Sequence, residues 1–197
     1  MGTVIFDTSM SLDGYMTAAD QTPEEPMGAG GLRLMEWVLG GDERNAELLA
    51  SWVGRLGASI AGRTTYDTSV AWWGTDGPSG AARRPLFVVT HNDPGTSPNP
   101  DVYTFVTDGI ERALERAQAA AGAADVVVMG GAELGRQFLA AGLIDEIQIH
   151  VAPVLLGAGT RMFDEQELAL ETIEVIETPA AIHQRYRVLK DVAGGTW

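Results

Sequence analysis

Two adjacent glycines, Gly130 and Gly131, end a run of apolar residues and precede a helical pattern. An apolar run bounded by glycines is typical of a buried parallel strand, so we expect strand, tight turn and helix over residues 125–139. Glycine lets the backbone come close to a ligand, and a helix amino terminus offers unpaired N–H groups. The turn therefore suits a phosphate, although glycines also end strands for packing reasons alone. It is not the G-x-G-x-x-G fingerprint, because Ala132 stands where glycine is required.

Two other segments carry groups that bind phosphate. One is the turn 62–65, in which an arginine and two hydroxyl residues follow a glycine at the expected start of a helix. The other is Thr90 with His91, at the end of the apolar run 86–90. Each has an ordinary alternative, such as a threonine-capped helix with a surface arginine. Because ligands of open α/β sheets bind at the carboxyl ends of strands, all three together favour one long phosphorylated ligand, and a dinucleotide has that size.

The elements that must position these groups follow from hydrophobic patterning. Helices are expected at 32–39, 44–56, from 62 onward, from Asp108 with Glu111 at the capping-box position, and after the glycine pair. Residues 17–31 are expected to be a loop. Strands are expected at 3–12, 58–61, 86–90, 102–106, 125–129, 143–154, 170–177 and 182–189. The last two form a hairpin, which predicts antiparallel strands added to a parallel α/β sheet.

Composition narrows the possible functions. The 197 residues are 45% hydrophobic and 20% charged without a linker, which favours one domain over 1–197. The absence of cysteine excludes disulfides, thiolate metal sites and the cysteine-dependent zinc site of nucleotide deaminases. The net charge of −14 disfavours binding of nucleic acid or an anionic membrane. Apolar runs are too short to span a bilayer and no signal peptide is evident, so a cytoplasmic location is expected.

Five motifs in order resemble the dihydrofolate reductase superfamily, and within it the reductase domain of the bifunctional riboflavin-biosynthesis deaminase-reductase. They cover nearly the whole chain: SLDGY at 11–15, GRTTYD at 62–67, VVTH at 88–91, VMGGA at 128–132 and APVLLGAGTRMF at 152–163. The resemblance implies a dihydrofolate reductase-like three-layer α/β/α fold, with a mostly parallel central sheet and an antiparallel C-terminal hairpin.

The resemblance also implies NADPH as the cofactor. In that family a cis peptide bond often joins the glycine pair, and strand one approaches the nicotinamide carboxamide through backbone, here at Ser9. The preference for NADPH over NADH would rest on Arg63 and His91. The implied pyrophosphate, phosphate and ribose contacts are Gly62, Arg63, Thr64, Thr65, Thr90, His91, Gly130, Gly131, Ala132, Glu133 and Leu134.

The residues that would bind the substrate or donate a proton to it, called the substrate half, are less well defined. Hydride transfer needs a proton source near the acceptor, and the candidates are Asp13, which also fits an ordinary Asp-Gly turn, and Glu36, which also fits a solvated helix acid. Trp37 and Tyr66 could stack on a planar substrate or belong to the core. Arg161 could meet a substrate phosphate or pair with a nearby acid such as Asp164.

Two histidines, His150 and His183, lie in expected strands without an obvious partner, and we interpret them as structural. No metal site is expected. The sequence thus predicts an NADPH-dependent reductase of a small heterocyclic or carbonyl compound, similar to 5-amino-6-(5-phosphoribosylamino)uracil or to a pterin. The alternative is an NADPH-binding protein without turnover, acting as a sensor or assembly subunit. The family resemblance also implies a homodimer formed through the terminal hairpin.

Overall fold

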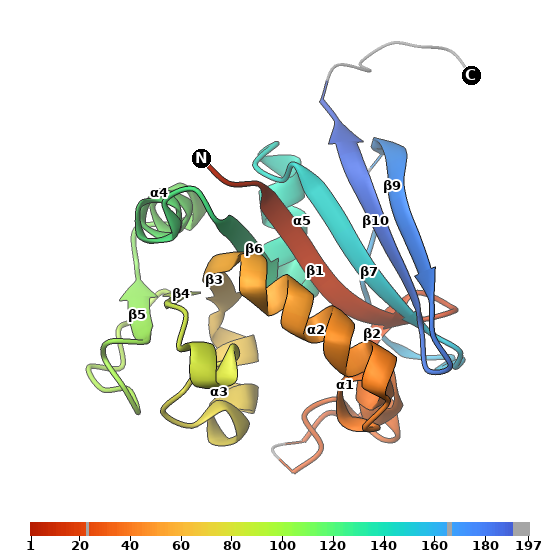
Figure 1. Ribbon diagram of the computed structural model, residues 1–197. Helices are drawn as coiled ribbons and strands as arrows, with labels where there is room; N and C mark the ends of the chain where they lie inside the picture. The colour runs from red at the N-terminus through yellow and green to blue at the C-terminus, as the bar shows by residue number, and fades with distance from the viewer. Residues whose placement is uncertain (23, 165–166, 191–197) are drawn as a thin grey trace.

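The computed structural model describes residues 1–22, 24–164 and 167–190. Eight strands form one twisted sheet in the order β5-β4-β3-β6-β1-β7-β10-β9, with helices on both of its faces (Figure 1). The strands from β5 to β7 pair in parallel, whereas β10 is antiparallel to both β7 and β9. The predicted dihydrofolate reductase-like α/β/α fold, with a mostly parallel sheet and an antiparallel C-terminal hairpin, is confirmed.

The expected strands all form, with boundaries shifted by a few residues. They are β1 (Val4–Ser11), β3 (Leu56–Gly62), β4 (Leu86–Val89), β5 (Tyr103–Val106), β6 (Asp125–Met129), β7 (Glu146–Ala152), β9 (Ala169–Glu177) and β10 (Ile182–Leu189). Two short strands were not predicted: β2 (Tyr15–Ala18) and β8 (Gly159–Arg161) pair with each other in a separate sheet. Part of the expected loop 17–31 is therefore a strand, because its partner lies about 140 residues away and leaves no local signal.

The helices make the two outer layers of the fold. On one face lie α1 (Glu36–Leu39), which follows the 3₁₀ helix η1 (Gly31–Met35), α2 (Glu43–Arg55) and α3 (Arg63–Trp73). On the other face lie α4 (Ile110–Ala121) and α5 (Ala132–Ala140). A single 3₁₀ turn, η2 (Gly80–Ala82), precedes β4.

Each face of the sheet has its own core. The larger core packs α4 and α5 against alternate residues of the central strands, with Phe6, Phe138 and Ile147 among its buried side chains. The smaller core packs α3 against β3, β4 and β5 around Tyr66. Period-two alternation in the strands therefore sends one set of side chains to each layer.

One local prediction, the cap of α4, was wrong. Asp108 does not cap α4: the N-cap is Gly109, at φ 95°, and the Asp108 carboxylate instead lies 3.5 Å from the Arg116 guanidinium. The sequence pattern missed this because glycine alone adopts such a backbone conformation readily. The cis bond that often joins the glycine pair in the resembling family is absent here, since every peptide bond among the described residues is trans.

Candidate functional site

The three turns that the sequence predicts to bind phosphate, at 62–65, 90–91 and 130–131, lie side by side at one edge of the sheet. They follow β4, β3 and β6, which are consecutive neighbours in the sheet and run parallel, so their carboxyl ends meet. The helices α3 and α5 begin directly after two of these strands, at Arg63 and Ala132. Their free amino-terminal N–H groups therefore serve the same edge, which is the binding edge of open α/β sheets.

The glycine pair touches the start of α3. Gly130 and Gly131 have φ values of 61° and 68°, which favour glycine. A Cβ atom at Gly130 would lie 2.8 Å from Cγ2 of Thr65, and one at Gly131 would lie 3.2 Å from its Oγ1. Only backbone without side chains fits beside Thr65, so the two predicted phosphate turns form one continuous surface.

Arg63 joins the first turn to the loop after β4. Its Nε donates to Asp67 at 2.7 and 2.8 Å, and its Nη1 donates to the Asn92 carbonyl at 3.3 Å. Thr90, which is buried, donates to the same carbonyl at 2.9 Å, while His91 is exposed. The Arg63 side chain is 39% exposed, so it is available to an anion at this edge.

Asp13 anchors a loop. Its two carboxylate oxygens accept the backbone N–H groups of Leu156 and Gly157, at 3.1 and 2.7 Å. The hydrogen bond from the Ser11 side chain, supported by these backbone donors, lowers the pKa of Asp13 to about 2. A carboxyl group that is held ionised in this way is a poor proton donor at neutral pH, and the geometry favours the loop-anchoring role.

The other predicted side chains of the substrate half have varied surroundings. Glu36 begins α1 and is exposed. Trp37 is buried and donates from Nε1 to Oγ of Ser9 at 2.9 Å. Tyr66 is buried in the smaller core, edge-on to Tyr103. The two aromatic residues therefore occupy the core positions that the sequence left open as their alternative.

Arg161 lies against the Asp13 loop. Its guanidinium carbon is 4.7 Å above the centre of the Tyr15 ring, a cation–π contact, and its side chain is exposed. Asp164, the local acid considered as its partner, pairs with Arg136 at 3.3 Å. Arg161 is thus held by an aromatic face with its charge directed to solvent.

A buried polar cluster was missed by sequence reasoning. His150 and His183 do have partners: their Nδ1 atoms are 2.8 Å apart, Nε2 of His150 is 3.3 Å from Oδ2 of Asp7, and Nε2 of His183 is 3.1 Å from Oδ1 of Asn45. The strand register creates this row, because His150 stands opposite Ser9 on β1 and opposite His183 on β10. Only knowledge of the register could have revealed it.

Aromatic rings cover the cluster. Trp37 lies 4.2 Å and Trp52 lies 5.0 Å from the ring centre of His150, and both rings also contact His183 edge-on. Burial, together with the neighbouring His150, lowers the pKa of His183 to about 4. His183 is therefore neutral at physiological pH.

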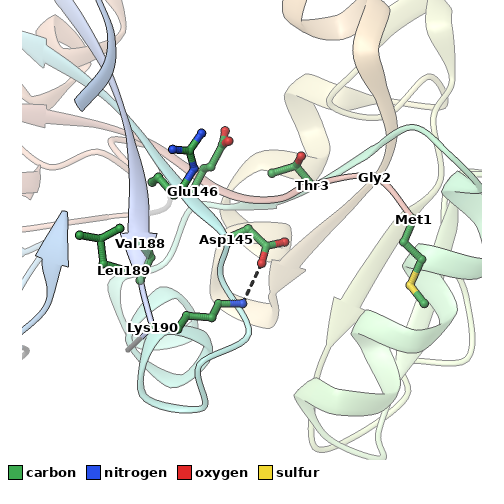
Figure 2. A pocket seen from close by; sticks show the side chains of 9 residues that line it. Met1, Gly2, Thr3, Asp145, Glu146, Val188, Leu189 and Lys190 are labelled. Carbon is green, nitrogen blue, oxygen red and sulfur yellow. Dashed lines mark hydrogen bonds and ion pairs between the residues drawn. The ribbon is translucent and has the colours of Figure 1, made fainter. Parts of the chain in front are cut away.

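A pocket lies at the opposite edge of the sheet from the glycine turns. It has a volume of about 520 Å³ and is lined by residues 1–3, Asp145, Glu146 and residues 187–190. Figure 2 shows Lys190 reaching Asp145, with 2.7 Å between Nζ and Oδ1. Because it lies at the amino ends of β1 and β7, it does not belong to the edge that carries the three turns predicted to bind phosphate.

The sequence and the fold have known relatives. The family model of the RibD C-terminal domain matches residues 2–183. A protein from Shewanella sp. PV-4, described as a candidate riboflavin biosynthesis protein, superimposes with a TM-score of 0.71 at 20% identity, over 96% of this chain and 100% of its own. A pyrimidine reductase-like protein from Corynebacterium diphtheriae gives 0.63 at 16% identity, over 96% and 92%.

Longer proteins match over part of their length. RibD from Acinetobacter baumannii superimposes with a TM-score of 0.65 at 22% identity, over 96% of this chain but only 59% of its own. No curated protein sequence matches this chain. Within the described residues, none of the helices combines the length and the apolar character needed to cross a bilayer.

Proposed function

This chain belongs to the RibD C-terminal domain family, and from that premise we propose that it is an NADPH-dependent reductase. The observation that carries the proposal is the meeting of three turns at one sheet edge, where Thr65 packs against Gly130 and Gly131. Backbone N–H groups at the starts of α3 and α5 would hold the pyrophosphate. Hydride transfer is chemistry that the bound nicotinamide would supply.

The cofactor contacts are proposed residue by residue. In the proposal, Gly62, Arg63, Thr64 and Thr65 hold one phosphate, and residues 130–134 hold the other. Arg63 and His91 would hold the 2′-phosphate of NADPH. This position is supported by the exposed guanidinium, which a hydrogen bond to the Asn92 carbonyl already directs to the loop that carries His91.

The proposed acceptor is a pyrimidine similar to 5-amino-6-(5-phosphoribosylamino)uracil, with a pterin as the other heterocycle. A protein from Thermotoga maritima, described as a diaminohydroxyphosphoribosylaminopyrimidine deaminase and a reductase of that uracil compound, supports the first choice. It superimposes with a TM-score of 0.65 at 13% identity, over 95% of this chain and 57% of its own. In this scheme Arg161, directed to solvent, meets the phosphate of the acceptor. The competing function is NADPH binding without turnover, in a sensor or an assembly subunit.

A cytoplasmic homodimer completes the proposal. The edge strand β9 exposes apolar side chains to solvent, among them Leu170, Ile173 and Val175. Exposed apolar edge strands are prone to pair with a second chain, so the terminal hairpin is the expected interface. Light scattering on the purified protein measures the mass directly, and a monomer at micromolar concentration would contradict this part of the proposal.

Titration calorimetry with NADPH and NADH tests the cofactor assignment. Replacing Arg63 with alanine should weaken NADPH binding by roughly 10- to 100-fold, because one charge-assisted contact is worth about 1.5–3 kcal/mol. NADH binding should weaken much less, because NADH lacks the 2′-phosphate. Arg112→Ala, which removes a similar helix ion pair on α4, is the matched control.

The outcomes separate the two functions. Equal losses of NADPH and NADH affinity in Arg63→Ala would remove the basis for NADPH preference. NADPH binding together with oxidation of NADPH by the uracil compound, by dihydrofolate or by a small carbonyl would establish the reductase. Tight binding without turnover of any acceptor favours the sensor, and a wild-type protein that binds neither cofactor contradicts the whole proposal.

A further inference from the structure

The buried cluster forms a continuous row of hydrogen-bonding groups across three strands and one helix. It runs from Asp7 on β1 to His150 on β7, then to His183 on β10 and to Asn45 on α2, with successive distances of 3.3, 2.8 and 3.1 Å. Both histidines and Asn45 are almost completely buried. In such a row, the position of each proton is decided by the group next to it.

The partners of His183 at the buried end of the row decide in which direction its hydrogen bonds are donated. Thr178 donates its hydroxyl proton to the Ala181 carbonyl at 3.0 Å, so its oxygen is an acceptor toward Nε2 of His183, 3.2 Å away. The second neighbour of Nε2 is the Oδ1 acceptor of Asn45. Because both neighbours accept, Nε2 of His183 carries hydrogen.

The remaining protons follow from this starting point. The lowered pKa of His183, to which Arg44 of α2 contributes, makes this ring neutral, so its Nδ1 has no hydrogen and accepts from Nδ1 of His150. Nε2 of His150 then faces Oδ2 of Asp7 with one proton required between them. In this arrangement the Asp7–His150 pair shares one proton that can be transferred.

The reverse direction is also available to the row. Rotating the Asn45 amide by 180° would place Nδ2 beside Nε2 of His183, and this buried Nδ2 atom has no hydrogen-bond partner among the described residues. Both histidines would then exchange tautomers, and Asp7 would be ionised and accept from His150. The row thus has two complete hydrogen-bonded arrangements that differ by one proton.

Asp7 is the end of this row that solvent reaches. Its side chain is 27% exposed, and in the part of the chain that the structure describes its Oδ2 atom faces Nε2 of His150 and accepts from Nε2 of Gln148 at 2.6 Å. In the β1–β6 ladder Asp7 stands opposite Met129, the residue before the glycine pair. Ser9 projects from the same face two residues later. The next charged group along β10, Arg185, is neutralised by Glu146 at 2.5 Å.

We propose that Asp7 is the proton donor of the reductase. His150, His183 and Asn45 are positioning residues whose hydrogen bonds favour the protonated carboxyl group. The inference rests on the proposed function. Bound NADPH would supply a hydride, with its electron pair, to the acceptor carbon of a C=O or C=N group, and the π electrons of that group would move to the heteroatom. That heteroatom takes the proton from Asp7, which leaves oxidised nicotinamide, reduced acceptor and an Asp7 carboxylate that recovers its proton from solvent.

The protons can be observed without a substrate. The chain has three histidines, and the exposed His91 serves as an internal reference in ¹⁵N spectra. At pH 7 we expect His150 to carry hydrogen on Nδ1 and His183 on Nε2. Asp7→Asn should preserve both tautomers, because the amide donates to His150 as the protonated acid does. A His150 ring with hydrogen on Nε2 alone would overturn the proposal.

Turnover tests the catalytic role. With the acceptor that oxidises NADPH, Asp7→Asn should lower kcat by roughly 10²- to 10⁴-fold, with KM and the NADPH dissociation constant within about threefold. Asp125→Asn makes the same change at the amino end of β6, where Asp125 accepts from the Thr3 amide, and should leave kcat unchanged. His150→Phe should lower kcat less than Asp7→Asn and shift the pH at which kcat declines.

Failure of this inference differs from failure of the reductase function. Full kcat in Asp7→Asn, in a protein that binds and oxidises NADPH, overturns the donor role while the reductase stands. The donor role is also overturned if His150→Phe leaves the pH profile of kcat unchanged. A wild-type protein that binds NADPH and reduces no acceptor overturns both the donor role and the reductase function. A wild-type protein that does not bind NADPH shows that the cofactor assignment is wrong.

Discussion

Two regions of the sheet differ in what lines them, backbone in one and side chains in the other. Between β4 and β6 the surface is mostly backbone, since two glycines and the starts of two helices leave room for a ligand. Between β1 and β10 the same face is filled with side chains, where two histidines, an asparagine and two tryptophans pack together. The first region, called the backbone half, is suited to binding phosphate. The second, called the side-chain half, is suited to holding protons in defined positions.

This difference affects how each half tolerates change. A backbone surface is lost when a side chain is added, whereas a polar cluster is lost when a side chain is removed and its partners stay unsatisfied. The three predictions below test this contrast and are ordered from the largest expected effect to the smallest.

Trp37→Ala should destabilise the protein by about 3–5 kcal/mol, because it removes the ring that covers His150 and the hydrogen bond to Ser9. Urea unfolding followed by circular dichroism measures the change. Trp72→Ala, at a position that is 67% exposed, should stay within about 0.5 kcal/mol of wild type. Similar losses in both variants would show that the cluster does not depend on its aromatic cover.

Acid should weaken the side-chain half selectively. The pKa of His183 is lowered from 6.5 to about 4, so the unfolded chain binds a proton more readily between these values. Stability should be complete above pH 6.5 and fall by roughly 3 kcal/mol as the pH approaches 4. His183→Gln should remove most of this slope in urea unfolding at a series of pH values. Asp13, whose pKa is lowered from 3.8 to about 2, contributes only below this window.

A persistent slope in His183→Gln would assign the acid sensitivity to groups outside the cluster. The charged neighbours that could shift the response are Asp7, His150 and Arg44.

Gly130→Ala should damage the backbone half. The added Cβ meets Thr65 at 2.8 Å at a φ of 61°, which should cost about 1–3 kcal/mol and weaken NADPH binding at least tenfold. Gly142→Ala is the matched control, because its φ is 66° and no atom of the described residues lies within 4 Å of the added Cβ. If both variants lose the same stability and keep NADPH binding, the close approach to Thr65 has no role in the site.

The sequence alone determined the fold and the backbone half. Glycine pairs, helix starts and apolar runs are local signals, because the conformation of a glycine or a helix terminus depends on residues that are neighbours in the chain. Residues 125–139 form the predicted strand, turn and helix, and the strands that follow form the predicted hairpin.

Only the tertiary structure decided the side-chain half. Asp7, Asn45, His150 and His183 are separated by up to 176 positions in the sequence, and the register of β1, β7 and β10 brings them into one row. The same reason explains β2 and β8, whose partners are distant, and the location of Asp164 beside Arg136 instead of Arg161. A histidine in an isolated strand pattern carries no information about its neighbours, because strand pairing, which no local pattern specifies, selects them.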